Sequence, residues 1–220
     1  SNALCAKAKA MYGYRIGEEG YSDLCRKQTL GEMVTYLKSQ TKYNEVLQDI
    51  NVRNVHRRQL EASLNKEYFE RCARLIKYAP KKNRDFYIQE VIGIEVQLIV
   101  DKVVSIKEKD QASFSLEIPD YLAGKMSFNI YGLINVDNYK DLVVYLRATR
   151  YYKILADFDF TAPIDINALE RQLKSLYYNT YIEAIKSNFK GKEQKELLDV
   201  LSTSIELANI TKIYRFKKYF

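Results

Sequence analysis

The sequence YLKSQTKYNEVL at residues 36–47 returns in outline as YLRATRYYKILA at residues 145–156. The two stretches align without a gap, from Tyr36 against Tyr145 at their start to Leu47 against Ala156 at their end. Leu37 also meets Leu146, and Tyr43 meets Tyr152. Because this offset is about half of the 220-residue chain, the match indicates an internal duplication.

Two further segments repeat in the same order. LEASLNKEYF at residues 60–69 aligns with LERQLKSLYY at residues 169–178, at the same offset as the first pair. IEVQLI (94–99) aligns with IELANI (205–210) if two residues are inserted. Three matches in one order predict a duplicated chain. We therefore expect a first repeat over residues 4–112 and a second over residues 113–220, with residues 1–3 set aside as a cloning scar.

Apolar residues recur at helical spacing in both predicted repeats. In the first repeat, one such face comprises Leu60, Leu64, Tyr68, Leu75, Ile76 and Ala79. In the second, it comprises Ile166, Leu169, Leu173, Leu176, Tyr177, Ala184 and Ile185. The chain has only three prolines and eight glycines, too few for the many turns of a sandwich or barrel. The sequence predicts an all-α fold of two similar helical-bundle repeats.

Local signals predict where the helices end. Asp165 stands just before an apolar run and is expected to be an N-cap. Pro80 is expected to end the first run, because proline cannot continue the helical hydrogen-bond ladder. The β-branched stretch at residues 91–106 is also compatible with a buried strand, and Gly93 weakens a helix there by about 1 kcal/mol. Its counterpart at residues 193–220 has a helical pattern, so we expect a helix in both places.

Composition and charge limit the class of protein. Three cysteines without CxxC spacing argue against a disulfide framework and favour a reducing compartment. The sequence contains no run of about 18 apolar residues, so we expect no membrane-spanning helix. The formal charge of +7 is compatible with nucleic acid, an anionic membrane surface or an acidic protein partner.

Groups that carry catalysis are scarce. His56 is the only histidine, and with scattered cysteines it does not make a zinc ligand set. We expect His56 to lie on the surface and Cys72 to be a small buried apolar residue. The sequence therefore predicts no catalytic, metal or cofactor site.

Basic residues form three clusters: Arg53, Arg57 and Arg58; Lys77, Lys81, Lys82 and Arg84; and Arg215, Lys217 and Lys218. Solvated helix ends explain such clusters, because positive charge complements the C-terminal helix dipole. The alternative is contact with an acidic surface or with nucleic acid, since Tyr78 and Tyr219 lie nearby and tyrosine stacks on bases. However, 28 acidic residues are interleaved with the 35 basic ones, so the sequence has no evident phosphate-tracking stripe.

The end of the chain, ELANITKIYRFKKYF (206–220), resembles the E-x-x-N-I-x-x-I-x-R-x-K signature of the C subunit of archaeal and bacterial V-type (A-type) ATPases. The d subunit of the vacuolar ATPase belongs to the same family. The opening segment AKAKAMYGYRI (6–16) is similar to that family's first helix. The matching signature positions, expected to be structural or interface residues, are Glu206, Asn209, Ile210, Ile213, Arg215 and Lys217.

The resemblance implies a non-catalytic subunit without cofactors that links the central stalk to the membrane rotor ring. It implies peripheral attachment on the cytoplasmic face, a role in ATP-coupled proton or sodium transport, and the stalk and ring subunits as partners. The family is built of three helical repeats, so a third repeat is expected beyond the two seen here. The first repeat departs from the signature, since Leu98, Val104 and Ile106 stand at the positions of Asn209, Arg215 and Lys217. A basic helical nucleic-acid-binding protein or a helical scaffold remains the alternative.

Overall fold

The computed structural model of the chain describes residues 2–109, 118–161 and 163–219, and these ranges contain helices and no strand. The helices are α1 (Asn2–Tyr12), α2 (Glu18–Cys25), α3 (Leu30–Gln40), α4 (Arg57–Lys77), η1 (Lys81–Asn83), α5 (Arg84–Tyr87), α6 (Gln89–Glu108), α7 (Asp120–Ala123), α8 (Ile130–Ile134), α9 (Tyr139–Tyr145), α10 (Tyr152–Asp157), α11 (Ile166–Asn188) and α12 (Gly191–Tyr219). The prediction of an all-α fold is confirmed. The stretch at residues 91–106 is helical, as expected, and forms most of α6.

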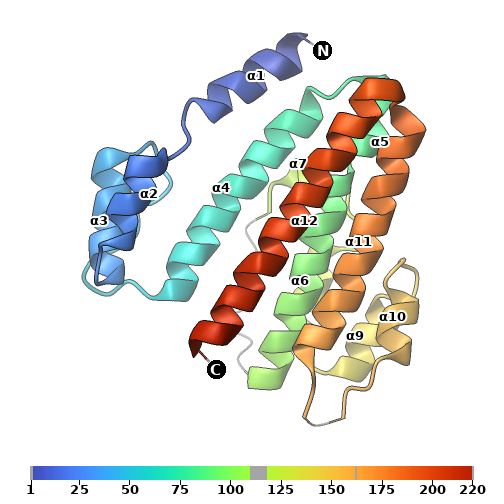
Figure 1. The fold of residues 1–220 in the computed structure, drawn as a ribbon. Helices are drawn as coiled ribbons and strands as arrows, with labels where there is room; N and C mark the ends of the chain where they lie inside the picture. Colours follow the sequence, from blue (N-terminus) through green and yellow to red (C-terminus); the bar gives the residue numbers. More distant parts are fainter. Residues whose placement is uncertain (1, 110–117, 162, 220) are drawn as a thin grey trace.

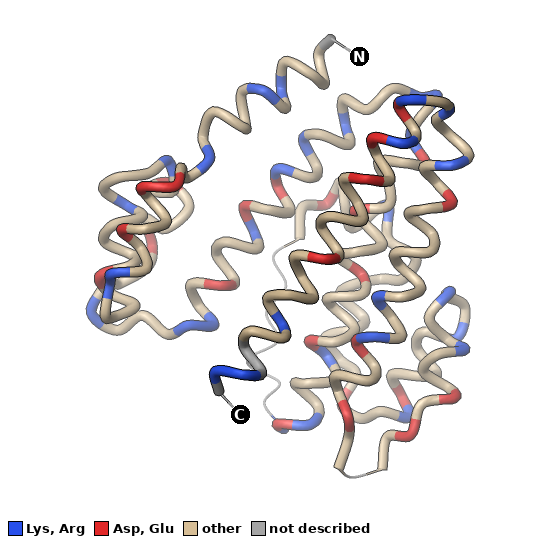
Figure 2. The backbone as a smooth tube through the Cα atoms, viewed as in Figure 1, with Lys and Arg blue, Asp and Glu red and all other residues tan. Residues whose placement is uncertain are grey.

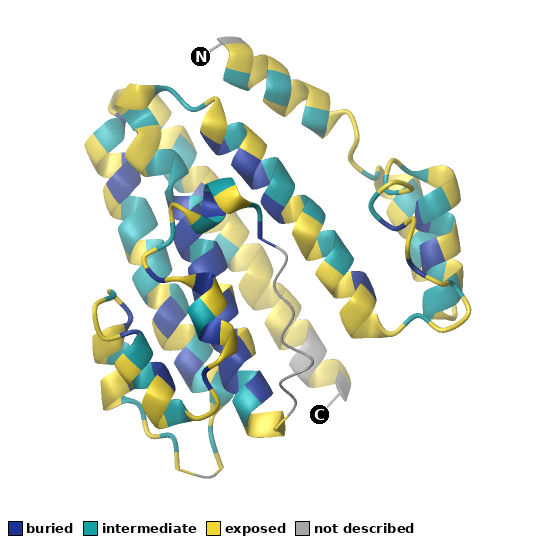
Figure 3. Cartoon of the chain, turned by 180° about the vertical axis from the view of Figure 1, so that it is seen from behind, coloured by how far each residue is buried: buried dark blue, intermediate teal, exposed yellow. Residues whose placement is uncertain are grey.

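Four long helices, α4, α6, α11 and α12, form the body of the molecule (Figure 1). Helix α6 packs most extensively on α11, and the short helices α7 to α10 cover the other side of α6 (Figures 1 and 3). The main core contains buried residues from α4, α6 and α11 together with Leu122, Leu133, Leu142 and Leu155 of the short helices. Helix α6 is therefore the centre of the bundle.

Two charged residues of α6 are buried and hydrogen-bonded. Glu95 is 2% exposed; its Oε2 accepts a 2.6 Å hydrogen bond from the Tyr151 hydroxyl, and its Oε1 accepts one from the Ser127 amide. Lys102, two turns further on, is fully buried and donates a 2.9 Å hydrogen bond to the carbonyl of Ile134. Residues two turns apart lie on the same helix face. Both charges thus attach α6 to the segment that contains α7 to α10.

A second, smaller core lies between α2, α3 and the start of α4, on the far side of α4 from α6 (Figure 1). Its buried members are Val34, Leu37, Leu47, Ile50 and Leu60. Leu60 belongs to α4, so this long helix contributes to both cores.

Helix boundaries recur at the offset expected from the repeat. Helices α3 and α9 begin at Leu30 and Tyr139, and helices α4 and α11 begin at Arg57 and Ile166, the same offset that separates Tyr36 from Tyr145. The residues before α3 and α9, Thr29 and Asn138, are both N-caps whose side chains accept a hydrogen bond from a backbone amide in the first turn. Leu37 and Leu146 are both buried. These correspondences agree with the proposal of two repeats over residues 4–112 and 113–220, whose boundary lies outside the described residues.

The paired tyrosines have similar surroundings. A Cβ atom placed on Gly20 of α2 would lie 3.2 Å from the Tyr36 hydroxyl. A Cβ atom placed on Gly132 of α8 would overlap the Tyr145 ring and hydroxyl. In each case a glycine of the preceding helix makes room for the tyrosine. Tyr36 and Tyr145 are both half-buried, so each packs partly against the fold.

The structure differs from the predicted α4 face at Tyr68, which is 46% exposed. The buried side of this part of α4 instead contains Phe69, Cys72, Ala73 and Ile76, at helical spacing. Tyr68 lies one residue off that line, and its hydroxyl reaches Glu90 of α6 at 3.0 Å.

Other local predictions are confirmed. The Asp165 side chain accepts a 2.9 Å hydrogen bond from the Ala168 amide and caps α11. Helix α4 ends at Lys77, shortly before Pro80. Helix α1 begins at Asn2 and so includes two of the three residues expected to be a cloning scar, while Ser1 lies outside the described residues.

Candidate interaction surface

Helix α12 is packed along its first half and exposed along its second. Its first half joins a small core with Ile185, Phe189 and Leu201, which contacts α11 and α5. Beyond Leu201, no large apolar side chain of α12 that the structure describes is fully buried, and the exposed ones include Leu207, Ile210, Ile213 and Tyr214. The exposed half is visible from behind in Figure 3.

The signature positions lie on this exposed half. Glu206, Asn209, Ile210, Ile213 and Lys217 are all exposed, and Ile210 and Ile213 are 61% and 58% accessible. Their spacing, which advances from Glu206 by whole helical turns, places them on one face of the helix. The side chain of Arg215 lies outside the described residues. We refer to the five described residues as the signature face.

A row of exposed apolar residues beside the signature face was not predicted from the sequence. Val200, Leu207 and Tyr214 are all exposed and follow one another at heptad intervals. Such spacing brings side chains to the same side of a helix. The heptad interval is the signal in the sequence that would have found them.

The equivalent helix of the first predicted repeat is buried. Ile94, Glu95 and Ile99 of α6 are 3%, 2% and 0% exposed. Their sequence counterparts in α12 are half-buried or exposed, and Ile210, the counterpart of Ile99, is largely accessible. The two helices share a pattern, but α6 is buried over most of its length, whereas the second half of α12 is exposed. The signature face of α12 is therefore exposed, whereas the equivalent positions of α6 are buried.

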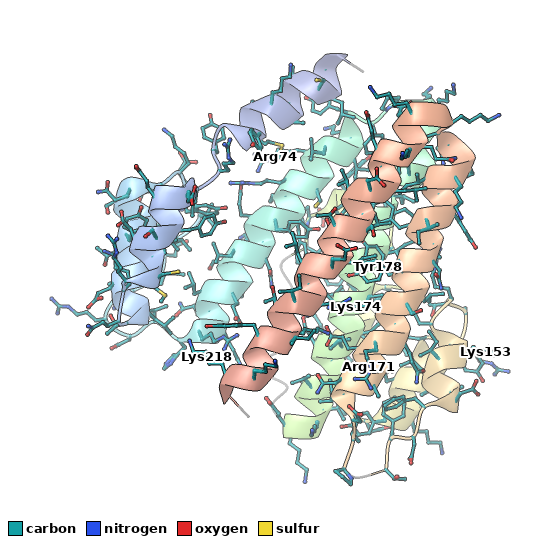
Figure 4. The ribbon with its side chains drawn as sticks, viewed as in Figure 1. Arg74, Lys153, Arg171, Lys174, Tyr178 and Lys218 are labelled. Carbon is teal, nitrogen blue, oxygen red and sulfur yellow. The ribbon has the colours of Figure 1, made fainter. Side chains whose placement is uncertain are left out.

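Glu170 of α11 ties the exposed half of α12 to the body. It accepts hydrogen bonds from Lys174 of its own helix at 2.5 Å and from Lys212 of α12 at 3.2 Å. Burial disfavours the charged carboxylate, but the two lysines outweigh that effect and lower the pKa of Glu170. Lys174 lies on the side of α11 next to α12 (Figure 4).

The basic clusters are partly engaged with carboxylates. Arg57 pairs with Glu61 at 2.8 Å and Arg58 with Glu108 at 2.5 Å. Hydrogen bonding to Glu61 and its charge raise the pKa of Arg57. Figure 2 shows basic and acidic residues interleaved along the helices. The structure thus brings opposite charges together in the first cluster.

His56 and Cys72, the residues considered for a metal or catalytic site, lie in different surroundings. His56 is exposed and precedes α4, and its side chain makes no capping hydrogen bond. Cys72 is buried, as expected, and burial followed by the Glu90 charge raises the pKa of its thiol to about 11. Among the described residues, no group of three or more His, Cys, Asp or Glu side chains is placed to hold a metal ion.

No helix in the described part of the chain is both long and apolar enough to cross a membrane. The longest, α12, carries charged residues from its first turn to its last. The described residues define an all-α bundle with an uncovered apolar helix face.

Comparison with known proteins identifies the family. The chain belongs to the ATP synthase (C/AC39) subunit family, whose model matches residues 4–220. The match covers both predicted repeats and the signature face.

Curated relatives agree with this assignment. The chain is 25% identical over 216 residues to the C subunit of the A-type ATP synthase of Thermococcus kodakarensis, a match that covers 96% of this chain and 56% of that protein. It is 24% identical over 217 residues to the protein of the same name in Methanosphaera stadtmanae, covering 96% of this chain and 53% of the relative. The chain thus spans about half the length of these relatives. No solved structure gives a significant match.

Proposed function

We propose that this chain is a non-catalytic coupling subunit of a rotary A-type or V-type ATPase or ATP synthase, which links the central stalk to the membrane rotor ring. In this role it contributes to ATP-coupled proton or sodium transport without binding a cofactor of its own. It is attached peripherally on the cytoplasmic face of the membrane, through its contacts with the ring.

The observation that carries the proposal is the family match over residues 4–220, which includes the uncovered signature face. Two relatives that align with 96% of this chain are named as ATP synthase subunits. A subunit of a multi-protein complex needs surfaces that contact its neighbours.

The bundle is built to resist deformation, which supports a coupling role. Helix α6 is buried over most of its length, and its two buried charges are hydrogen-bonded to the segment around α7 to α10. Close-packed interiors have low compressibility and transmit strain. A part that passes torque from one element to another requires such rigidity.

The signature face of α12 is the surface that we propose for contact within the complex. Exposed apolar patches flanked by polar groups mark interaction sites. Glu206, Asn209 and Lys217 provide polar groups beside Ile210 and Ile213, an arrangement of an apolar centre and a polar rim.

Binding to purified partners tests the proposal. The chain is mixed with the central-stalk subunits and, separately, with detergent-solubilised rotor ring from the same organism, and complexes are measured by size-exclusion chromatography and interferometry. We expect a stable complex with at least one of them. The double variant Ile210→Asp/Ile213→Asp should weaken it by about tenfold or more, since apolar residues at the centre of an interface can act as hot spots worth over ~1 kcal/mol, and each change also introduces a charge there.

The matched control is Ser175→Asp/Asn179→Asp, two exposed positions of α11, which should leave the affinity unchanged. The absence of a complex with either partner would contradict the proposal, and so would ATP hydrolysis by the purified chain. Retention on a single-stranded oligonucleotide at about 50 mM salt, lost steeply at higher salt, would favour the nucleic-acid alternative instead.

A further inference from the structure

A cavity of about 270 Å³ lies between α5, α6, α11 and α12. Four aromatic residues and Glu90 line it on the side of α5, α6 and α11, namely Phe86, Tyr177, Tyr178 and Tyr181. The remaining lining is mostly aliphatic: Ile185 of α11, and Leu197, Val200, Leu201 and Ser204 of α12. Tyr178 lies on the side of α11 that is next to α12 (Figure 4). We call this space the aromatic cavity. It is separate from the signature face, which lies further along α12.

Glu90 carries a negative charge at the wall of the aromatic cavity. Its Oε1 accepts a 3.1 Å hydrogen bond from the Tyr181 hydroxyl, and its Oε2 accepts a 3.0 Å hydrogen bond from the Tyr68 hydroxyl. Within the described part of the chain, no lysine or arginine forms a salt bridge with Glu90. Two neutral donors orient the carboxylate but leave its charge uncompensated.

Two tyrosines of the cavity, Tyr177 and Tyr181, stay neutral. Burial, followed by the Glu90 charge, raises the pKa of both Tyr177 and Tyr181 well above the usual phenol value. Their rings therefore add a negative π-face without adding a second full charge.

The rings are close together and tilted relative to one another. The centroid of Tyr177 is 5.1 Å from that of Tyr178 and 5.7 Å from that of Tyr181, with interplanar angles of 44° and 50°. Phe86 lies 5.5 Å from Tyr181 at 55°. A cation within about 6 Å of a ring face is attracted by the ring quadrupole.

Neighbouring residues hold these rings in place. Tyr177 lies against Gly93 of α6, where an added Cβ would come within 3.2 Å of the ring. Phe86 packs edge-on against Phe189 with centroids 4.9 Å apart. Side chains fixed in this way need little ordering when a ligand binds.

We propose that the aromatic cavity binds an organic cation, specifically a methylated ammonium group, with Glu90 as the counter-charge, the four rings along one wall and the aliphatic side chains of α12 along the other. Calcium and magnesium take six or more oxygen ligands, and zinc sites usually use several His or Cys side chains, whereas the cavity offers one carboxylate. A primary ammonium has three hydrogen-bond donors to satisfy, whereas a methylated one has fewer or none and gains from aromatic faces. This inference does not depend on the role in the ATPase.

Titration of the whole chain with choline, monitored by heteronuclear NMR, tests the proposal. The control ligand is 3,3-dimethylbutan-1-ol, which has nearly the same shape without the charge. We expect choline to shift resonances of cavity residues and to bind about tenfold or more tightly than the alcohol, because cation–π attraction and a counter-charge each contribute about 1 kcal/mol. Equal binding of the two ligands, or no shift at tens of millimolar choline, would overturn the proposal.

Variants separate the charge from the rings. Glu90→Gln keeps the size of the side chain and should weaken choline binding by about fivefold, because the counter-charge contributes about 1 kcal/mol. Glu183→Gln, at an exposed position of α11, should not change it. Tyr178→Leu removes one ring face and should weaken binding, whereas Tyr178→Phe keeps the face and should bind as the parent does. Choline affinity unaffected by Glu90→Gln would refute the role of the carboxylate.

A second set of ligands identifies the source of the cation. N-acetyl-trimethyllysine amide represents a methylated side chain of another protein, and unmodified N-acetyl-lysine amide is its control. Tighter binding of trimethyllysine than of choline would identify a protein-borne ligand, and the reverse would identify a free one. Preference for unmodified lysine over both would contradict the proposal.

Discussion

The hydroxyl group of Tyr151 donates a 2.6 Å hydrogen bond to Oε2 of Glu95 inside the main core, where both side chains are almost fully buried. A buried carboxylate is costly unless hydrogen bonds replace its lost water. The Ser127 amide supplies a second donor to the same carboxylate. The bond joins α6 to the residue immediately before α10, so it connects the centre of the bundle to its short helices.

Replacing Tyr151 by phenylalanine should therefore destabilise the fold. The change removes one of the two donors to Glu95 and leaves a buried oxygen without its partner, at a cost of about 1–3 kcal/mol. Urea unfolding followed by circular dichroism measures the loss. The neighbouring Tyr152 is 37% exposed, and Tyr152→Phe should change stability by less than about 0.5 kcal/mol. Equal effects at both positions would argue against a special role for the Tyr151 hydroxyl.

Stability should also fall at high pH because of Tyr151. Burial, followed by the charge of Glu95, raises the pKa of Tyr151 in the folded protein. The unfolded chain releases this proton near pH 10, while the folded chain keeps it, so rising pH favours unfolding from about pH 10 upward. Tyr151→Phe lacks this proton, and its stability deficit should shrink by about 1.4 kcal/mol by pH 11. Parallel stability curves for the two proteins between pH 8 and about pH 11 would contradict the assignment.

Substitution of Gly132 by alanine should destabilise the region around α8. The new Cβ would overlap the Tyr145 ring, whose hydroxyl is held by the carbonyl of Asn129. Overpacking of this kind costs about 1–3 kcal/mol, which exceeds the roughly 1 kcal/mol gained by replacing a helical glycine. Thermal unfolding of Gly132→Ala, Tyr145→Leu and the double variant forms a double-mutant cycle. The double variant should be more stable than the sum of the two single effects predicts, and strict additivity would exclude the clash.

The exposed half of α12 should fray when its tie to α11 is removed. Glu170→Gln weakens the pairing with Lys212, which is the salt bridge that joins the two helices in the described residues. Because these groups are partly exposed, the effect on global stability should stay within about 1 kcal/mol. Amide exchange between residues 207 and 214 should become faster, while exchange in α6 stays unchanged. Glu196→Gln, which disrupts an exposed pair with Lys192, serves as the control.

Helices and their ends were predictable because their signals are local. The Asp165 cap and the break at Pro80 depend on residues within a few positions of each helix end. The pairing of Tyr43 with Tyr152 was less informative about burial, since the structure buries Tyr151 instead. The turns that precede Tyr43 and Tyr151 differ in length by one residue. The Thr41 hydroxyl donates to the carbonyl of Leu37, four residues earlier, whereas the Thr149 hydroxyl donates to that of Leu146, three residues earlier.

The candidate interface could be predicted only in part. Helical spacing is sufficient to place the five signature positions on one face. Sequence alone does not reveal that this face is uncovered, because Ile99 and Ile210 have equivalent patterns and opposite burial. The aromatic cavity was not predictable either, since it is formed by residues far apart in the sequence, such as Phe86 and Tyr181.

The two buried charges on α6 have a mechanical consequence. Glu95 and Lys102 hold the helix at two points about 10 Å apart along its axis, by bonds that depend on exact position. Apolar contacts alone tolerate small slips, whereas a shift of one turn, about 5.4 Å, would break both hydrogen bonds and strand two charges in the core. The central helix is thus held against sliding by two positional hydrogen bonds as well as by apolar packing.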